Sequence, residues 1–82
     1  MSVRISRHAR RRMKLYGASV DEVLAVITEP EEVEIVGQRV HAVKCIAGRF
    51  SEYPLKVVYE QGEEGVLIVT AYPFKKGPGG GS

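Results

Sequence analysis

The first sixteen residues of this 82-residue chain contain no acidic side chain, although ten acids occur in the rest of it. The same segment holds six of the twelve Lys and Arg residues, so the formal charge of +2 divides into a basic segment and an acidic body. Charge separated in this way favours an anionic partner, either a nucleic acid or an acidic protein. The alternative is a solvated basic helix that only aids solubility.

Several other features are scarce or absent. Cys45 is the only cysteine, so an internal disulfide is excluded, a core cysteine is expected, and a cytoplasmic location is the default. No apolar run approaches the ~20 residues of a membrane helix, and the N-terminus lacks the apolar core of a signal peptide. The chain has no Walker loop, dinucleotide fingerprint or serine-nucleophile motif. His41 and Cys45 are two ligands spaced too far apart for one metal ion, so neither metal nor cofactor is expected.

The apolar periodicity predicts a single α+β domain over residues 1–76, followed by a flexible Gly-rich tail at 77–82. After a short extended segment at 3–5, Ser6 and Gly17 are the expected caps of a first helix. A capping box at 19–22 begins a second helix, which Pro30 ends. The period then changes to two, which predicts strands at about 33–36, 39–47, 55–60 and 66–72. Short connections favour a four-stranded, mainly antiparallel sheet with both helices packed on one face.

Strand alternation sorts the side chains of the predicted sheet into two faces. The face expected to meet the helices carries Val43, Cys45, Ala47, Leu55, Val57, Tyr59, Leu67, Val69 and Ala71. The other face is expected to present Lys44, Lys56, Glu60, Thr70 and Tyr72, diluted by apolar residues. A mixed surface of this kind is a candidate binding surface for a partner.

Several motifs resemble those of an uncharacterised bacterial and archaeal family of small domains. The pattern S-x-H-A-x-x-R-M occupies Ser6–Met13, and Gly17, the segment Ser19–Val23 and Pro30 follow it as in that family. Near the other end, L-x-V-V-Y begins at Leu55 and T-x-Y-P begins at Thr70. The similarity covers residues 5–76. The family in turn resembles the RelE/ParE-like toxins, which implies two N-terminal helices on a curved antiparallel sheet and an antitoxin partner.

What this resemblance implies is a metal-independent ribonuclease, in which the RNA 2′-hydroxyl attacks the neighbouring phosphate. His8 would act as the acid or base, because imidazole titrates near neutral pH. Arg12 lies four residues later on the same side of the helix and would hold the phosphate. Thr70 and Tyr72 match the family's final motif and would line the site. Further RNA contacts are expected from Arg11, Lys44, Arg49 and Lys56.

Simpler roles compete with these. His8 can be a surface histidine without catalytic work, and Arg12 can form an ion pair with Glu22 or Glu60. The sheet carries few basic residues for a toxin of this type. A non-enzymatic nucleic-acid- or protein-binding module of the same fold is therefore the second hypothesis, and a structural module docking an acidic chain is the third.

RNA and an acidic antitoxin are the expected partners, and a membrane is not. A homodimer is a further expectation, because a chain this short buries only about 60% of its unfolded surface.

Overall fold

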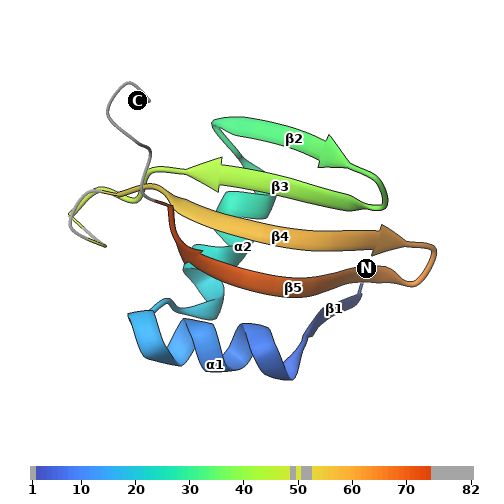
Figure 1. Ribbon diagram of the computed structural model, residues 1–82, viewed down its shortest axis with the longest axis horizontal. Coiled ribbons are helices and arrows are strands. Elements are labelled where there is room, and N and C mark those ends of the chain that lie inside the picture. Colours follow the sequence, from blue (N-terminus) through green and yellow to red (C-terminus); the bar gives the residue numbers. More distant parts are fainter. Residues whose placement is uncertain (1, 49, 51–52, 75–82) are drawn as a thin grey trace.

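The computed structural model describes residues 2–48, 50 and 53–74. Its two helices and five strands follow one another as β1 (Ser2–Ile5), α1 (Arg7–Tyr16), α2 (Val20–Thr28), β2 (Glu32–Val36), β3 (Arg39–Lys44), β4 (Leu55–Gly62) and β5 (Gly65–Pro73). The strands form one sheet in the order β1-β5-β4-β3-β2 (Figure 1). No helix in the described part of the chain is long and apolar enough to cross a membrane.

The two helices begin and end where local sequence signals predict. The Ser6 side chain caps α1, and Gly17 ends it in the left-handed conformation, with φ of 72°. In α2 the capping box is complete: Ser19 Oγ accepts from the Glu22 N–H, while the Glu22 carboxylate accepts from the Ser19 N–H. Both predictions of helix caps are confirmed, because capping depends on residues only a few positions apart.

The sheet has one strand more than the sequence predicted, and it is mixed. Residues 2–5 form β1, which pairs in parallel with β5, whereas every other neighbouring pair is antiparallel. The expectation of four strands in a mainly antiparallel sheet was therefore wrong in its count. Four residues give too little alternation to identify a strand, and their partner lies more than sixty residues later in the chain.

Ser6 joins the first helix to the last strand. Its N–H donates to the Ile68 carbonyl at 3.0 Å, and its hydroxyl donates to the Val69 carbonyl at 2.9 Å. The same Oγ accepts from the Ala9 N–H at 3.0 Å as the helix cap. These bonds meet β5 where its register against β4 shifts, so that Tyr59 pairs with Ile68 but Val58 pairs with Thr70. Val69 is thus the extra residue of a β-bulge.

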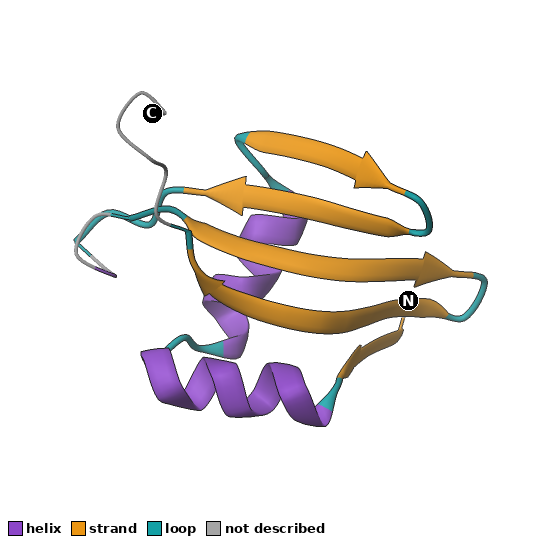
Figure 2. Cartoon of the chain, viewed as in Figure 1, coloured by secondary structure: helices purple, strands orange, loops and turns teal. Residues whose placement is uncertain are grey.

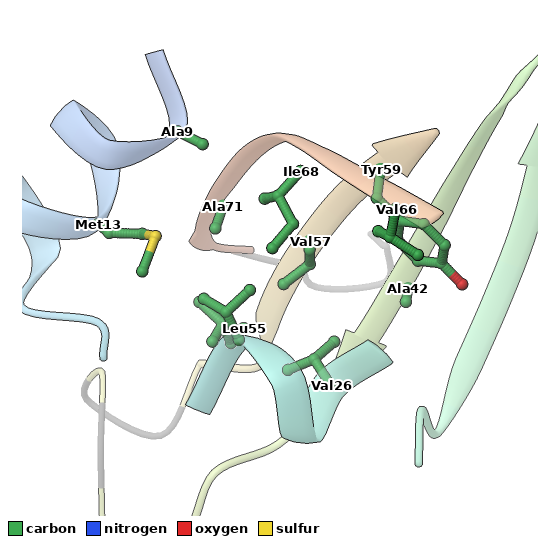
Figure 3. Close-up of a cluster of buried hydrophobic side chains, with 11 residues drawn as sticks. Ala9, Met13, Val26, Ala42, Leu55, Val57, Tyr59, Val66, Ile68 and Ala71 are labelled. Carbon is green, nitrogen blue, oxygen red and sulfur yellow. The ribbon is translucent and has the colours of Figure 1, made fainter. Parts of the chain in front are cut away.

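The core lies between the helices and one face of the sheet. Figure 2 shows α2 running behind the strands and α1 running alongside β5, at the end of the sheet opposite β2. The buried cluster contains Ala9, Met13, Val23, Val26, Ala42, Leu55, Val57, Tyr59, Val66, Ile68 and Ala71, most of which are drawn in Figure 3. The predicted row on β4 is confirmed. We call the opposite face of the sheet, turned away from the helices, its open face.

The predicted faces of β3 and β5 need correction. On β3 the core contacts come from Val40 and Ala42, not from Val43. Both faces of this strand carry apolar residues, so alternation alone did not fix its orientation. Cys45 and Ala47 follow the end of β3 and are exposed, so the expected core cysteine was also wrong.

On β5 the core side changes partway along the strand. The bulge at Val69 restarts the alternation, so Val66 and Ile68 face the core before it and Ala71 faces the core after it. Leu67 was expected in the core but is 38% exposed. Val69 was also expected there and lies outside the buried cluster. Only Ala71 of the predicted row is correct, because a bulge inserts one residue that sequence alternation cannot reveal.

Gly65 provides a direct test of the β1–β5 pairing. It has φ of 138°, and a Cβ atom at this position would lie 1.9 Å from the Ser2 carbonyl oxygen. We expect Gly65→Ala to lower the free energy of unfolding by at least about 2 kcal/mol, from backbone strain and the displacement of β1. Chemical denaturation would measure it.

Gly62 supplies the matched control in the same hairpin, since a Cβ there meets nothing within 4 Å. Gly62→Ala should change stability far less than Gly65→Ala. Equal effects of the two substitutions would contradict the close approach of β1 to Gly65.

Candidate nucleic-acid interface

Helix α1 buries a narrow apolar stripe and exposes its charge. Ala9 and Met13 face the core with exposures of 0% and 6%. All five basic side chains of the helix are exposed: Arg7, Arg10, Arg11, Arg12 and Lys14. Among the described residues, none of these five forms an ion pair. The helix therefore presents a cluster of uncompensated cations to solvent, which we call the basic face of α1.

Stability does not account for this charge. The first turn of α1 contains no acidic residue, and Arg7 and Arg10 lie near the helix N-terminus. A cation there opposes the helix dipole, at a cost on the order of 0.3–1 kcal/mol at low ionic strength. α2, in contrast, places Asp21 and Glu22 in its first turn, where the dipole favours them. The dipole therefore favours Lys14, in the last turn of α1, but not Arg7 and Arg10.

His8 and Arg12 lie together on the exposed side of α1. Each precedes a buried residue by one position and so lies about 100° around the helix axis from the buried stripe. Four residues separate them, which is about 6 Å along the axis, so the two side chains are neighbours. Neither forms a hydrogen bond or ion pair within the described part of the chain. The imidazole of His8 and the guanidinium of Arg12 are thus both accessible to a phosphate.

Among the described residues, Arg12 forms no ion pair with Glu22 or Glu60. Glu60 instead pairs with Arg39, whose Nε lies 3.2 Å from Glu60 Oε2. The Glu22 carboxylate accepts the Ser19 N–H of the capping box. Both acids that could have neutralised Arg12 are therefore directed elsewhere.

Thr70 and Tyr72 lie on the open face of the sheet. They flank Ala71, which is fully buried on the core side, and they follow the bulge that sets this alternation. Across the ladder Thr70 pairs with Val58, and Tyr72 pairs with Lys56. The Lys56 ammonium lies over the Phe74 ring, 4.6 Å from its centroid. The open face thus combines a lysine, a threonine and two aromatic rings.

The four predicted catalytic residues fall into two groups. His8 and Arg12 come from α1, whereas Thr70 and Tyr72 come from the open face of β5. No hydrogen bond, ion pair or ring contact joins the two groups. α1 packs against the core side of β5 (Figure 1), whereas Thr70 and Tyr72 lie on the open face of that strand, so the structure does not bring the two groups together.

The residues predicted to bind RNA are dispersed over the molecule. Arg11 lies on the basic face of α1, and Lys56 lies on the open face. The Lys44 ammonium donates to the Glu29 carbonyl at 3.1 Å, at the C-terminus of α2, where the helix dipole favours a cation. Lys44 therefore has a structural role. Arg49 lies outside the described residues.

A shallow hollow on the open face was not predicted. It measures about 370 Å³ and lies over β2, β3 and β4. It is lined by Glu32, Val33, Glu34, His41, Val43, Lys56 and Phe74. The Nδ1 atom of His41 is buried there and has no hydrogen-bond partner among the described residues. No sequence signal identifies this hollow, since its members come together only through the registers of three strands.

Metal-ligating side chains are not clustered in the described part of the chain. Within residues 2–48, 50 and 53–74, no group of three His, Cys, Asp or Glu side chains is placed to hold a metal ion.

Comparison with known proteins gives the family but not an activity. No curated protein and no solved structure is significantly similar to the chain. A family model described as "Domain of unknown function (DUF4258)" matches residues 5–73, from the last residue of β1 to the end of β5. The match spans both helices and all but the start of the sheet, and the chain belongs to this DUF4258 family.

Proposed function

We propose that the protein binds RNA through the basic face of α1. The observation that carries this proposal is the exposure of five basic side chains on one ten-residue helix, none of them in an ion pair within the described part of the chain. Four of the five are arginines, whose planar guanidinium groups match phosphate oxygens in bidentate geometry. The resemblance to RelE/ParE-like toxins agrees with an RNA partner.

The open face of β5 offers a second contact surface, on the other side of that strand from α1. RNA proteins bind unpaired bases by stacking them on aromatic rings, and Tyr72 lies on the strand against which α1 packs. Thr70 adds a hydroxyl that can donate to a phosphate oxygen. In this arrangement α1 holds the backbone of a single strand, while Tyr72 and Lys56 meet its bases or its next phosphates.

The binding proposal predicts a strong dependence on salt. If all five cations meet phosphates, the logarithm of the association constant should fall with the logarithm of salt concentration with a slope of up to about −3.5. Arg11→Gln and Arg12→Gln should each weaken binding and reduce that slope by about 0.7. Fluorescence anisotropy of a labelled, mixed-sequence single-stranded RNA would measure both quantities.

Arg39→Gln is the matched control, because it removes the same charge from a guanidinium that already pairs with Glu60. We expect this variant to bind RNA with nearly unchanged affinity and slope. Equal losses in Arg39→Gln and Arg12→Gln would contradict binding by α1 and indicate attraction by net charge.

Metal-independent RNA cleavage is the second candidate function. The specific observation that favours it is that His8 and Arg12 are exposed neighbours on one side of α1. Neither forms a hydrogen bond or an ion pair among the described residues. In the reaction the 2′-oxygen forms a bond to phosphorus as its proton passes to a base, and the bond from phosphorus to the 5′-oxygen breaks as that oxygen gains a proton. His8 would supply one of these transfers, and Arg12 would stabilise the charge on the phosphorane.

The same pair also suggests why cleavage needs more than α1. One imidazole provides the base or the acid at a given moment, so the other proton transfer requires a second group. Tyr72 was predicted for that role, because its hydroxyl can donate a proton, and Thr70 was predicted to contact the phosphate. Both lie on the open face of β5, which is turned away from α1, so the geometry favours binding over cleavage.

Cleavage can be tested with purified protein and a mixed-sequence RNA in excess EDTA. An enzyme of this type should leave 2′,3′-cyclic phosphate ends, and His8→Ala should lower the rate by roughly 10²–10⁴-fold, the usual contribution of general acid–base catalysis. His41→Gln is the control, since His41 is the other histidine of the chain and lies in the hollow on the open face. Intact RNA, or equal loss in both variants, would contradict this role of His8.

An acidic protein partner fits the same surface. An antitoxin that covered the basic face of α1 would neutralise the charge on which RNA binding depends, so partner and RNA would compete. A homodimer that leaves α1 exposed is compatible with either function.

A further inference from the structure

Strand β2 leaves one edge of the sheet open. It is the terminal strand, with β3 as its neighbour on one side only among the described strands. All five of its residues are exposed, including Val33 at 51%, Ile35 at 73% and Val36 at 51%. An edge strand presents a row of outward N–H and C=O groups, and an apolar edge strand is a template for pairing with another chain.

The two faces of β2 differ in chemistry. Val33 pairs with the buried Ala42, and Ile35 pairs with Val40, so both apolar side chains lie on the core side of the sheet. α2 packs against β3 and β4 and leaves this part of the core side uncovered. Glu34 pairs with His41 and lies on the open face, where its carboxylate is exposed. A strand beside β2 would therefore meet Val33 and Ile35 on one face, and the carboxylates together with Val36 on the other.

We propose that β2 binds an extended segment of a partner protein as a sixth strand, and that this segment alternates basic with apolar residues. Its apolar side chains would lie beside Val33 and Ile35 and extend the core surface past the end of α2. Its basic side chains would lie beside Glu34, where opposite charges across a strand pair are favourable. The outward backbone groups of β2 would supply the ladder hydrogen bonds.

A second copy of the chain fits this edge poorly. When a two-fold axis relates two β2 strands, the strands pair antiparallel. At the axis, one residue then lies opposite its own copy. An axis at Glu34 places two Glu34 carboxylates opposite each other, and an axis at Val33 places Glu32 opposite Glu34. Like charges directly opposite are unfavourable. The glutamates thus select against self-pairing and in favour of a basic partner.

A register with the axis at Glu32 places two Glu32 carboxylates opposite each other, and one with the axis at Val36 pairs only Val36 within the strand. The register with the axis at Ile35 avoids the carboxylates but gives a short ladder. It pairs Glu34 with Val36 and then places Val33 opposite Gly37, which belongs to the turn and has φ of 62°. Only residues 34–36 of each copy would then be paired as extended strand, fewer than the mode of about five or six residues in protein strands.

The test uses a synthetic peptide of alternating arginine and valine, with blocked ends. Titrated into the ¹⁵N-labelled protein, it should shift the amide resonances of residues 32–36 and give NOEs between its backbone and that of β2. Glu34→Lys should weaken binding at least tenfold. Glu63→Lys makes the same charge change at the β4–β5 turn and should leave the affinity nearly unchanged.

A peptide N-methylated at alternate residues separates strand addition from attraction by charge. It keeps every arginine but cannot form the ladder, so it should lose binding. Equal binding of the methylated peptide, shifts outside β2, or no binding at millimolar concentration would each overturn the proposal. A dimer in sedimentation equilibrium that Ile35→Lys dissociates would also overturn it, in favour of a second copy.

The strand-binding proposal and the RNA-binding proposal can be tested independently. A variant with Arg11→Gln and Arg12→Gln should still bind the peptide, because α1 and β2 lie at opposite ends of the sheet (Figure 1). Loss of peptide binding in that variant would contradict a site on β2.

Discussion

The attachment of α1 to β5 is the contact on which the rest of the structure depends. Ser6 provides it through three hydrogen bonds, two to carbonyls of β5 and one that caps the helix. Ala9 and Met13 are the residues of α1 that belong to the buried cluster. Because Ser6 fixes the start of the helix, these two apolar contacts are enough to hold α1 against the sheet. The remaining positions are free to carry charge. Without the hydrogen bonds of Ser6, a helix with so many arginines and so few apolar contacts would not pack stably against the sheet.

Features that depend on neighbouring residues were predictable from the sequence, and features that depend on distant pairing were not. The caps at Ser6, Gly17 and Ser19 follow from local hydrogen bonding, and the four longer strands follow from apolar alternation. The pairing of β1 and the bulge at Val69 are settled by the contact between the two ends of the domain. Alternation could not reveal either of them.

The same distinction between local and distant contacts applies to the candidate site. The sequence identified the basic helix and the His8–Arg12 pair, since both rest on spacing within one helix. It could not show that Lys44 binds the end of α2 or that Lys56 lies over Phe74, because those contacts arise from tertiary packing. The hollow around His41 also depends on register. The order of strands then separates the two proposed surfaces, with the basic face of α1 beyond β5 and the acidic edge at β2.

The two bonds from Ser6 to β5 join residues 62 and 63 positions apart. During synthesis, β1 and α1 therefore leave the ribosome long before their docking strand exists. Over that interval the cationic segment has no sheet to pack against, while the β2–β3 hairpin and α2 can already associate. Closing so long a loop carries a substantial entropic cost, which places docking of α1 late in folding. The basic face thus acquires its fixed position only once the domain is complete.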